Sequence, residues 1–568
     1  MTSNDPILRI SGLSVAFASG KELVTAISNV SIDVAAGETV AVVGESGSGK
    51  STTAAAINRL LPENGRITSG SILFEGREMT ELGENELVRL RGAGIGLVPQ
   101  DPMSNLNPLV RIGEQIGEAL EVHGYESGAG VQRRVVELLD MVGIPDAEQR
   151  SRQYPHEFSG GMRQRALIAM GLACKPRLLI ADEPTSALDV TVQRRILDQL
   201  DELTGQMGTA VFLITHDLAL AAERADRIVV MYRGEIVEEG SSRDIFTNPR
   251  HEYTKQLLAA APSLATARTA MSATRIEPGA ATVGTAPGTA SERTESGPKA
   301  ADVADQPLVE VRDLRKVFEL RSPKAGEPDS FTAVDGVSFS ITKGSTVSIV
   351  GESGSGKSTT ANLVLGLEDI TGGSILFDGV DLTTLKRREL FAFRRRVQPV
   401  FQNPYASLDP RYTIEQTIIE PLKVHRVGTA ATRRARVAEL LEQVALPTSM
   451  ASRLPHELSG GQRQRVAIAR ALTLEPDLVV LDEAVSALDV LVQAQTLDLL
   501  AELQQRLGLS YLFISHDLAV VRMISDEVHV MQRGRIVESG TPEQIFDAPQ
   551  DPYTRELLEA IPGAHLTH

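Results

Sequence analysis

Ten residues, GESGSGKSTT, occupy positions 44–53 and recur without a change at positions 351–360. Each copy follows a short apolar run, at residues 39–43 or 347–350, and leads into an alanine- or leucine-rich stretch with helical spacing. The pattern G-x-x-x-x-G-K-[ST] between a strand and a helix is that of a phosphate-binding loop, or P-loop. Its backbone N–H groups point at phosphate oxygens, the helix start adds a positive field, and the lysine supplies a cation. Two copies predict two nucleotide sites, with phosphate contacts from Gly44, Ser46, Gly47, Ser48, Gly49, Lys50, Ser51 and Thr52 and from Gly351, Ser353, Gly354, Ser355, Gly356, Lys357, Ser358 and Thr359.

The duplication extends far beyond the P-loops. Equivalent residues lie 307 positions apart at the P-loop lysines, 302 apart at Gln100 and Gln402, and 300 apart at Ser159 and Ser459. A period this long indicates two whole domains rather than a solenoid of short repeats. The length of 568 residues is ample for two domains that each have their own core.

The segment between the two copies differs in composition. Residues 262–306 are rich in Ala, Thr, Gly, Ser and Pro and hold little that could be buried, which predicts a flexible linker. We therefore expect a first domain with its C-terminal extension at residues 1–261 and a second one at residues 307–568. Such a linker would keep the two domains at high effective concentration without fixing their geometry.

The composition is typical of a soluble globular protein. A hydrophobic content of 42% and a charged content of 23% are ordinary, and no apolar run is longer than a strand. The first residues, MTSNDPILRISG, lack the basic and hydrophobic regions of a signal peptide, so we expect neither a membrane span nor export. The net charge of −17 argues against general nucleic-acid binding, which needs clustered Lys and Arg. The one cysteine, Cys174, fits a reducing cytosol and is expected to pack in a core.

Within each copy, strand-length apolar runs alternate with helical patterns. This alternation predicts an α/β fold with a mostly parallel sheet flanked by helices. One strand in each copy ends in an Asp-Glu pair, and buried carboxylates are costly unless they are paired or bound to a metal. We expect the first acid, Asp182 or Asp482, to hold Mg²⁺ together with the P-loop serine, Ser51 or Ser358.

The second acid of each pair, Glu183 or Glu483, would lie near the terminal phosphate and polarise an attacking water. A further strand in each copy ends at a histidine, His216 or His516. This histidine could reach the same phosphate and hold the water and the glutamate in place. In isolation each would be taken for a surface or structural residue, but with a P-loop in both copies they indicate catalytic residues.

A glutamine ends another apolar run in each copy. Gln100 and Gln402 introduce the Pro/Asn-rich loops QDPMSNLNP and QNPYASLDP. A glutamine amide at this place can join the Mg²⁺ shell and respond to the terminal phosphate. The predicted metal ligands are therefore Ser51, Gln100, Asp182, Ser358, Gln402 and Asp482.

A Ser-Gly-Gly segment precedes a long helical pattern in each copy, as HEFSGGMRQR and HELSGGQRQR. A serine cap followed by glycines leaves backbone donors open, which makes the helix start an anion site. Since each domain already has such a site in its P-loop, we expect the second one to bind the nucleotide held by the other domain. The residues concerned are Ser159, Gly160, Gly161, Ser459, Gly460, Gly461 and Gln462.

The ordered set of P-loop, glutamine loop, S-G-G segment, D-E strand end, S-A-L-D and H-D resembles the ATP-binding-cassette (ABC) ATPases. The resemblance occurs twice and covers nearly the whole chain apart from the linker. It implies two P-loop NTPase domains, each with a RecA-like core, an antiparallel β subdomain and an α-helical subdomain, the last at about residues 101–157 and 403–457. It also implies a head-to-tail pair of cassettes with two ATP molecules, each bound between one P-loop and the S-G-G segment of the other cassette.

The same resemblance assigns four further residues by position. Phe17 and Phe318 would stack on adenine, with core packing as the alternative. Asp189 and Asp489 of the two S-A-L-D segments would communicate across the interface. ATP and Mg²⁺ are the implied cofactors.

Two departures from the family pattern distinguish the copies. Ala484-Val485 stands where Pro184-Thr185 stands in the first copy, and we expect at most a changed turn after Glu483. Met162 replaces the glutamine of the S-G-G-Q form, which makes the two composite sites inequivalent without implying an inactive one.

More specific resemblance lies in GESGSGKST, PHEFSGGMRQR, PHELSGGQRQR and the tails at residues 248–262 and 548–562, which are similar to the peptide-and-nickel branch of bacterial ABC importers. The first half resembles the F-S-G-G-M subunit type and the second its L-S-G-G-Q partner. The resemblance implies the ATP-hydrolysing subunit of a dipeptide or oligopeptide importer. Some relatives carry a cysteine cluster for iron and sulfur in the tail. With one cysteine in the chain, we expect no iron–sulfur cluster.

The implied mechanism is closure of the cassettes on ATP and opening after hydrolysis. The implied partners are two transmembrane permease subunits, contacted by the glutamine-loop regions, and an extracytoplasmic solute-binding protein, with no nucleic acid. The implied location is the cytoplasmic face of the cell membrane, through the permeases. The cargo is left open among dipeptides, longer peptides, glutathione and nickel complexes.

Three alternatives differ in what they require. A tandem-cassette translation factor typically has a long, charged helical linker, whereas residues 262–306 are rich in Gly, Thr and Pro. A cassette ATPase of DNA repair or chromosome structure would carry long coiled coils or zinc-binding cysteines. A fused sugar-importer ATPase often has a degraded second half, whereas Lys357, Glu483 and His516 are retained here.

Overall fold

The structure is a computed structural model that describes residues 5–20, 22–185, 188–260, 307–319, 330–403, 407–486 and 488–563. The predicted linker at residues 262–306 lies outside the described residues, as do Ser186, Ala187 and Ala487 of the two S-A-L-D segments. The chain divides into two compact units, one formed mainly by the first half of the chain and the other mainly by the second half.

Each half holds a four-stranded antiparallel sheet. In the first unit the strand order is β2-β1-β4-β5, and in the second it is β12-β11-β14-β15. The strands of the first unit are β1 (Leu8–Ser19), β2 (Glu22–Val34), β4 (Gly65–Phe74) and β5 (Arg77–Glu78). Those of the second unit are β11 (Val309–Glu319), β12 (Ser330–Ile341), β14 (Gly372–Phe377) and β15 (Val380–Asp381).

Each half also holds a six-stranded sheet, ordered β10-β9-β3-β8-β7-β6 in the first unit and β16-β17-β18-β13-β19-β20 in the second. All neighbours pair in parallel except β10 with β9 and β20 with β19. The first sheet contains β3 (Thr39–Val43), β6 (Ile95–Val98), β7 (Leu178–Asp182), β8 (Ala210–Thr215), β9 (Arg227–Tyr232) and β10 (Glu235–Ser241). The second contains β13 (Thr346–Val350), β16 (Val397–Val400), β17 (Leu478–Asp482), β18 (Ser510–Ser515), β19 (Glu527–Gln532) and β20 (Arg535–Gly540).

The composition of β3 explains why it lies inside its sheet. Its residues are apolar and mostly β-branched, and alternate side chains point to opposite faces. Val40 and Val42 pack in a cluster with the antiparallel sheet, whereas Ala41 and Val43 pack in a cluster with the helices of the other face. The sheet therefore separates two apolar layers.

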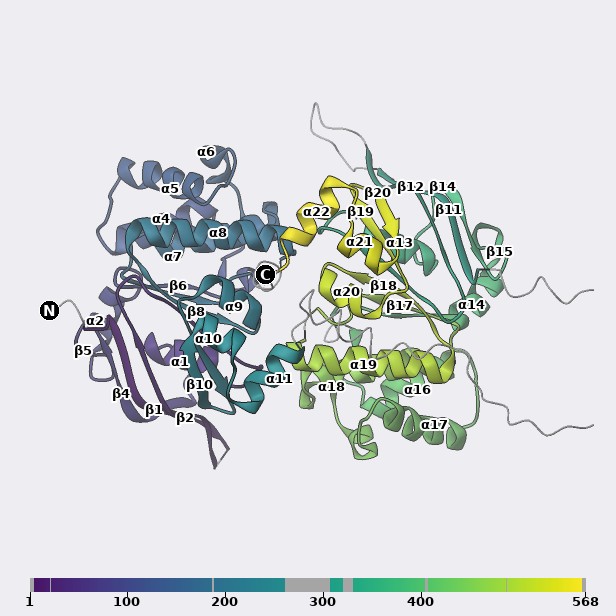
Figure 1. Ribbon diagram of the computed structural model, residues 1–568, viewed down its shortest axis with the longest axis horizontal. Coiled ribbons are helices and arrows are strands. Elements are labelled where there is room, and N and C mark those ends of the chain that lie inside the picture. Colours follow the sequence, from purple (N-terminus) through teal and green to yellow (C-terminus); the bar gives the residue numbers. More distant parts are fainter. Residues whose placement is uncertain are drawn as a thin grey trace, which may run out of the picture. The chain divides into compact units, whose positions relative to one another are not determined.

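Helices of the first unit cover this sheet and extend into a helical region. In Figure 1 the strands β1, β2 and β4 lie at one end of this unit and α4, α5 and α6 at the other. The helices are α1 (Lys50–Ile57), α2 (Glu84–Leu90), α3 (Pro102–Asn105), α4 (Ile112–Val122), α5 (Ala129–Met141), α6 (Ala147–Arg150), η1 (Pro155–Glu157), α7 (Gly160–Leu172), α8 (Val190–Met207), α9 (Leu218–Arg224), α10 (Ser242–Thr247) and α11 (Glu252–Ala260).

The second unit repeats this set with small differences. Its helices are α13 (Lys357–Val364), η2 (Leu382–Thr384), α14 (Arg387–Arg396), α16 (Ile414–Val424), α17 (Ala430–Gln443), η3 (Thr448–Ser452), η4 (Pro455–Glu457), α18 (Gly460–Leu472), α19 (Val490–Leu507), α20 (Leu518–Ile524), α21 (Pro542–Asp547) and α22 (Pro552–Glu559).

The two sheets and the helical region of each unit confirm the predicted α/β fold with a mostly parallel core sheet, an antiparallel subdomain and a helical subdomain. The helical subdomain contains α4 and α5 in the first unit and α16 and α17 in the second. Because β3, β7 and β8 are adjacent and parallel, the segments that follow their carboxyl ends meet at one edge of the sheet. The P-loop, the Asp-Glu pair and the histidine of the sequence motifs lie at this edge.

Candidate nucleotide site

The P-loop of the first unit connects β3 to α1 through a tight backbone path. Gly44 has a φ of 152°, and a Cβ at this position would lie 2.2 Å from the carbonyl oxygen of Met231. Gly47 and Gly49 have φ values of 79° and 104°, a region that disfavours residues with a side chain. The glycines of the motif are therefore required both for the turn and for the close approach to β9.

Lys50 begins α1 and is buried. Its Nζ donates hydrogen bonds to the carbonyl oxygens of Gly44 and Glu45, at 2.6 and 2.8 Å. Burial lowers the pKa of Lys50, although the nearby carboxylates, Glu183 foremost among those of this sheet edge, oppose this shift. The ammonium group is thus held over the start of the loop. Next to it the Oγ of Ser48 is buried and makes no hydrogen bond within the described residues, as expected of a donor that serves a ligand.

The hydroxyl of Ser51 contacts the acid at the end of β7. Ser51 Oγ donates to Asp182 Oδ1 at 3.1 Å. Burial raises the pKa of Asp182, and the hydrogen bond from Ser51 offsets only part of this shift. A hydroxyl and a carboxylate oxygen in this arrangement suit Mg²⁺, which takes a few protein oxygens together with phosphates and water. Within the described ranges no three His, Cys, Asp or Glu side chains gather as a metal site, and a magnesium shared with phosphates needs no such group.

Glu183 follows β7 in an unusual backbone conformation. Its φ is 44°, and its N–H donates to the carbonyl of Ile214 at 2.9 Å. A left-handed conformation is costly for a residue with a long side chain and is stable only where the surroundings impose it. The carboxylate accepts a hydrogen bond from Gln100 Nε2 at 2.6 Å and lies 3.2 Å from His216 Nδ1. The structure therefore brings Gln100, Glu183 and His216 together.

The charges of this group are coupled. Burial acts to raise the pKa of Glu183, but the hydrogen bond and charge of His216, the charge of Lys50 and the hydrogen bond from Gln100 outweigh it, and the pKa is lowered. Burial acts to lower the pKa of His216, but the contact with Glu183 outweighs it, and the pKa is raised. Glu183 is therefore a carboxylate at neutral pH, which is the form that accepts a proton from water.

The second unit repeats every one of these contacts. Lys357 Nζ donates to the carbonyls of Gly351 and Glu352 at 2.8 and 2.7 Å, and Ser358 Oγ to Asp482 Oδ1 at 3.1 Å. The φ values of Gly351, Gly354 and Gly356 are 148°, 79° and 107°.

The group of glutamine, glutamate and histidine in the second unit keeps its geometry despite the departure at Ala484-Val485. Glu483 has a φ of 48°, accepts from Gln402 Nε2 at 2.7 Å and lies 3.3 Å from His516 Nδ1. Ala484 and Val485 are both buried, so apolar side chains suit the positions that follow the glutamate. The contacts of Glu483 with Gln402 and His516 therefore match those of Glu183 with Gln100 and His216.

The S-G-G segments begin α7 and α18. Ser159 Oγ accepts from the N–H of Met162 at 3.4 Å, and Ser459 Oγ accepts from the N–H of Gln462 at 3.3 Å. In the second unit the side chain of Gln462 also accepts from the N–H of Ser459 at 3.1 Å, a contact that Met162 cannot make. The structure does not bring these serines into the hydrogen-bonded group of their own P-loop.

The remaining predicted residues are two phenylalanines near the ends of strands and two aspartates just before helices. Phe17 is half-buried on β1, where it pairs with Val24 and Gly65, and Phe318 is half-buried on β11. Lys316 Nζ lies 4.8 Å from the centre of the Phe318 ring. Asp189 and Asp489 directly precede α8 and α19.

The sequence motifs did not indicate a tyrosine that contacts each P-loop. The hydroxyl of Tyr253, on α11, accepts a hydrogen bond from the N–H of Glu45 at 2.9 Å. The hydroxyl of Tyr553, on α22, accepts from the N–H of Glu352 at the same distance. Both lie in tail segments, where the matching Y-T dipeptides were the available signal.

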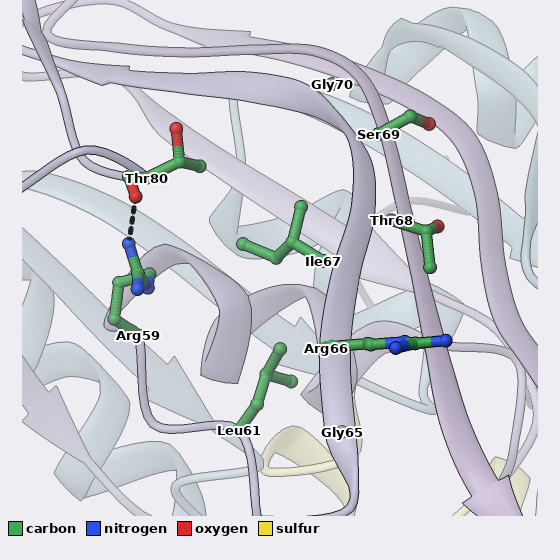
Figure 2. Close-up of a pocket in the computed structure, with 9 residues that line it drawn as sticks. All are labelled: Arg59, Leu61, Gly65, Arg66, Ile67, Thr68, Ser69, Gly70 and Thr80. Carbon is green, nitrogen blue, oxygen red and sulfur yellow. Dashed lines mark hydrogen bonds between the residues drawn. The ribbon is translucent and has the colours of Figure 1, made fainter.

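A separate hollow of about 510 Å³ lies on the antiparallel subdomain of the first unit (Figure 2). Its lining includes Arg59, Arg66 and Thr80, and Arg59 donates to the carbonyl of Thr80 at 2.6 Å. The hollow lies along β4, which has 10 residues where β14 has 6. None of the P-loop residues lines it, so it is not the nucleotide site.

Comparison with known proteins agrees with the geometry. Residues 27–186 and 334–486 match the family described as ABC transporter, and residues 237–288 and 537–566 match the oligopeptide/dipeptide transporter C-terminal region. None of the helices in the described part of the chain combines the length and apolar character that a membrane crossing requires.

Similar proteins include the glutathione import ATP-binding protein GsiA of Salmonella choleraesuis, which is 45% identical over 98% of this chain and 90% of its own length. The GsiA protein of Escherichia coli strain K12 is 46% identical over the same shares. Among solved structures, cbiO1 from Clostridium perfringens is 27% identical, with 43% of this chain and 92% of that one covered and a TM-score of 0.38. The two family matches and the full-length relatives establish that the chain belongs to the ABC transporter family and is an ATPase with two ATP-binding cassettes.

Proposed function

We propose that this ATPase energises a membrane importer of short peptides and that glutathione, itself a tripeptide, is the most specific candidate cargo. The observation that carries the proposal is the match to the oligopeptide/dipeptide transporter region after each cassette. The relatives that span the chain are named as glutathione import proteins, which supports glutathione over a nickel complex or a sugar.

We propose a separate role for each residue of the site in the first cassette. The P-loop N–H groups and Lys50 bind the phosphates of ATP, and the Glu183 carboxylate accepts a proton from the attacking water. The water oxygen forms a bond to the γ-phosphorus while the bond to the bridging oxygen of ADP breaks. His216, 3.2 Å from Glu183, holds the glutamate in place. Lys357, Glu483 and His516 have the same roles in the second cassette.

We propose that Mg²⁺ is bound by Ser51 and Asp182 in one cassette and by Ser358 and Asp482 in the other, with Gln100 and Gln402 nearby. Bound there, the ion would neutralise charge on the phosphate oxygens. The hydrogen bonds of Gln100 and Gln402 to the catalytic glutamates support a role in linking the metal shell to the water-activating group. Phe17 and Phe318 remain proposed adenine contacts.

We further propose two composite ATP sites, in which the S-G-G segment of one cassette completes the P-loop site of the other, with Asp189 and Asp489 communicating between them. What supports this arrangement is the order of the motifs in the sequence and the open donors at the starts of α7 and α18. Disulfide trapping of Ser46→Cys with Ser459→Cys, in a Cys174→Ser background, tests it. ATP should promote the cross-link, and an ATP-independent or absent cross-link would contradict it.

The partners that an importer requires are proposed as well. Two transmembrane permease subunits would form the path for the cargo, and an extracytoplasmic solute-binding protein would deliver it. The chain would then lie at the cytoplasmic face of the membrane through contacts with the permeases. Co-sedimentation with membranes only when the permeases are co-expressed would support this, and recovery with ribosomes would overturn it.

Uptake assays decide the cargo. In cells that lack the chromosomal gene, the wild-type chain should restore uptake of ³⁵S-labelled glutathione, and unlabelled dipeptides should compete to the extent that they share the importer. The double variant Glu183→Gln/Glu483→Gln, expressed to the same level, is the control for ATP-driven transport. If the chain restored uptake of a labelled dipeptide but not of glutathione, the cargo class would still be peptides and glutathione would be excluded as the cargo. Restored uptake of nickel or a sugar alone would overturn the proposal.

A further inference from the structure

A tyrosine outside the sequence motifs fixes the beginning of each P-loop. In the first unit Tyr253 lies on α11, and 4% of its surface is exposed. Its hydroxyl oxygen accepts the backbone N–H of Glu45, the second residue of the loop, at 2.9 Å. Burial raises the pKa of Tyr253, so the hydroxyl is neutral at physiological pH.

The second unit makes the same contact with different surroundings. Tyr553 on α22 accepts the N–H of Glu352 at 2.9 Å. In the first unit the ring of Tyr232 lies 4.3 Å from that of Tyr253, whereas the position equivalent to Tyr232 is Gln532. The hydroxyl contact is thus common to both units, although the packing beside the ring is not.

A glutamate on the last strand of the sheet holds each tyrosine helix in position. Glu238 of β10 accepts hydrogen bonds from the N–H groups of Arg250 and His251, at 2.7 and 3.0 Å. Glu538 of β20 accepts from the corresponding N–H groups of residues 550 and 551, at 2.7 and 3.1 Å. Burial acts to raise the pKa of Glu238, but the side chain of Thr254 and the two N–H groups outweigh it and the pKa is lowered, so Glu238 is a carboxylate at neutral pH. The start of each helix, and with it the tyrosine, is therefore attached to the core sheet.

The same peptide unit of the loop is held at two points. The N–H of Glu45 is bound by Tyr253, while the carbonyl of Gly44, on the other side of the same peptide bond, is bound by Lys50 Nζ at 2.6 Å. Two of the three ammonium donors of Lys50 bind the carbonyls of Gly44 and Glu45, so a lysine that turns to bind a triphosphate with more than one donor exchanges carbonyl contacts for phosphate contacts. The tyrosine contact does not involve the phosphate-binding donors and can persist when the lysine moves. Its contribution to the position of the loop is therefore larger with nucleotide than without it.

We propose that Tyr253 and Tyr553 are positioning residues for ATP binding, which hold the start of each P-loop in its phosphate-binding form once the lysine has turned to the nucleotide. This inference rests on the proposed assignment of Lys50 and Lys357 to the phosphates. It gives the C-terminal extension of each cassette a direct role in the nucleotide site.

The test is the full-length double variant Tyr253→Phe/Tyr553→Phe, which retains both rings and removes only the two acceptor oxygens. The affinity for ATP is measured in Mg²⁺-containing buffer by calorimetric titration, and the melting temperature is measured with and without ATP. We expect ATP binding to weaken by about threefold to tenfold, the factor that corresponds to one neutral hydrogen bond. The KM for ATP should rise by a similar factor.

Two control variants separate positioning from general stability. Tyr511→Phe removes a buried hydroxyl that donates to the carbonyl of Leu500 at 2.9 Å, inside the second core. It should lower the melting temperature without changing the affinity for ATP. Tyr232→Phe alters the tyrosine whose ring packs against Tyr253 and should change neither quantity substantially.

The double variant Lys50→Ala/Lys357→Ala distinguishes failure of this inference from failure of the site itself. If the lysine variant binds ATP as tightly as the wild type, the proposed phosphate site is wrong, and the positioning role of Tyr253 and Tyr553 is then wrong as well. If the lysine variant loses binding while the Tyr→Phe variant binds ATP like the wild type, only the positioning role is wrong. A loss of melting temperature in the Tyr→Phe variant with unchanged affinity likewise overturns it.

Discussion

Glu183 Oε1 lies 3.2 Å from Nδ1 of His216, although the two residues follow different strands of the sheet. Glu183 directly follows β7 and His216 directly follows β8, and these strands are neighbours in the parallel sheet. The contact raises the pKa of the histidine and lowers that of the glutamate against the opposing effect of burial. It therefore keeps a buried carboxylate charged at the place where we propose that water is activated.

Glu183→Gln and Glu483→Gln should each lower ATP turnover by at least about tenfold if hydrolysis at the two sites is coupled. The amide cannot accept the proton of the attacking water, whereas its size is nearly unchanged. Phosphate release at saturating ATP measures the effect, and calorimetric ATP titration checks that binding is retained. A single variant with the wild-type rate would show that its site is regulatory.

Removal of divalent metal should abolish hydrolysis, and Ser51→Ala combined with Ser358→Ala should raise the Mg²⁺ concentration for half-maximal rate by about tenfold or more. The reason is the loss of the hydroxyl that lies 3.1 Å from Asp182 or Asp482. Serine-to-threonine variants at the same positions keep a hydroxyl and are the matched control. Equal Mg²⁺ dependence of the alanine variant and the wild type would contradict the assigned metal site.

Gly44→Ala and Gly205→Ala should change stability in opposite directions. A Cβ on Gly44 would lie 2.2 Å from the carbonyl oxygen of Met231, and its φ of 152° disfavours alanine, so we expect a loss of about 2–4 kcal/mol. Gly205 lies within α8, and a Cβ there meets no atom within 4 Å, so alanine should add about 0.5–1 kcal/mol. Chemical denaturation of the full chain measures both, and a stable Gly44→Ala variant would contradict the tight loop.

His529 should make the second unit sensitive to acid. Burial lowers the pKa of His529 to about 4, whereas an unfolded histidine has a pKa of about 6.5. Between these values the unfolded state binds more protons, so the stability is fully present above pH 6.5 and is lost as the pH falls toward 4, by about 3 kcal/mol in total.

The variant His529→Val introduces the residue that occupies the equivalent position in the first unit, Val229. The hydroxyl of Ser539, 2.8 Å from His529 Nδ1, is exposed and can turn to water. Thermal unfolding between pH 4.5 and 7.5 should show a smaller loss of stability for the variant than for the wild type. Parallel pH profiles of the two proteins would disprove the role of His529.

The sequence predicts which residues of the candidate site lie together where a motif has a recognisable pattern. Lys50, Ser51 and Asp182 could be assigned because a P-loop and an acidic strand end each have a recognisable pattern, and parallel strands bring such ends together. The apolar run of β3 indicates a buried strand, but it does not indicate which strands flank it, because the pairing with β8 and β9 is set by the tertiary fold.

Two features of the site have no local signature. The left-handed backbone of Glu183 is imposed by neighbours, since a glutamate does not favour it by itself. The contact of Tyr253 uses the backbone N–H of a residue 208 positions away, and any residue except proline carries that donor. Neither could be read from the residue types alone.

The place of β3 between β8 and β9 sets the order in which the first cassette can be completed on the ribosome. Thr39 pairs with Val211, so the nascent strand that carries the P-loop has no lateral partner until β8 has been synthesised, and it lacks its second partner, β9, until synthesis has passed Tyr232. Its tyrosine anchor arrives later still. Pairings this distant in sequence form slowly, because a long loop must close before they contribute. ATP therefore cannot guide the early folding of the first cassette. It can stabilise the folded state only once nearly all of the cassette has been synthesised.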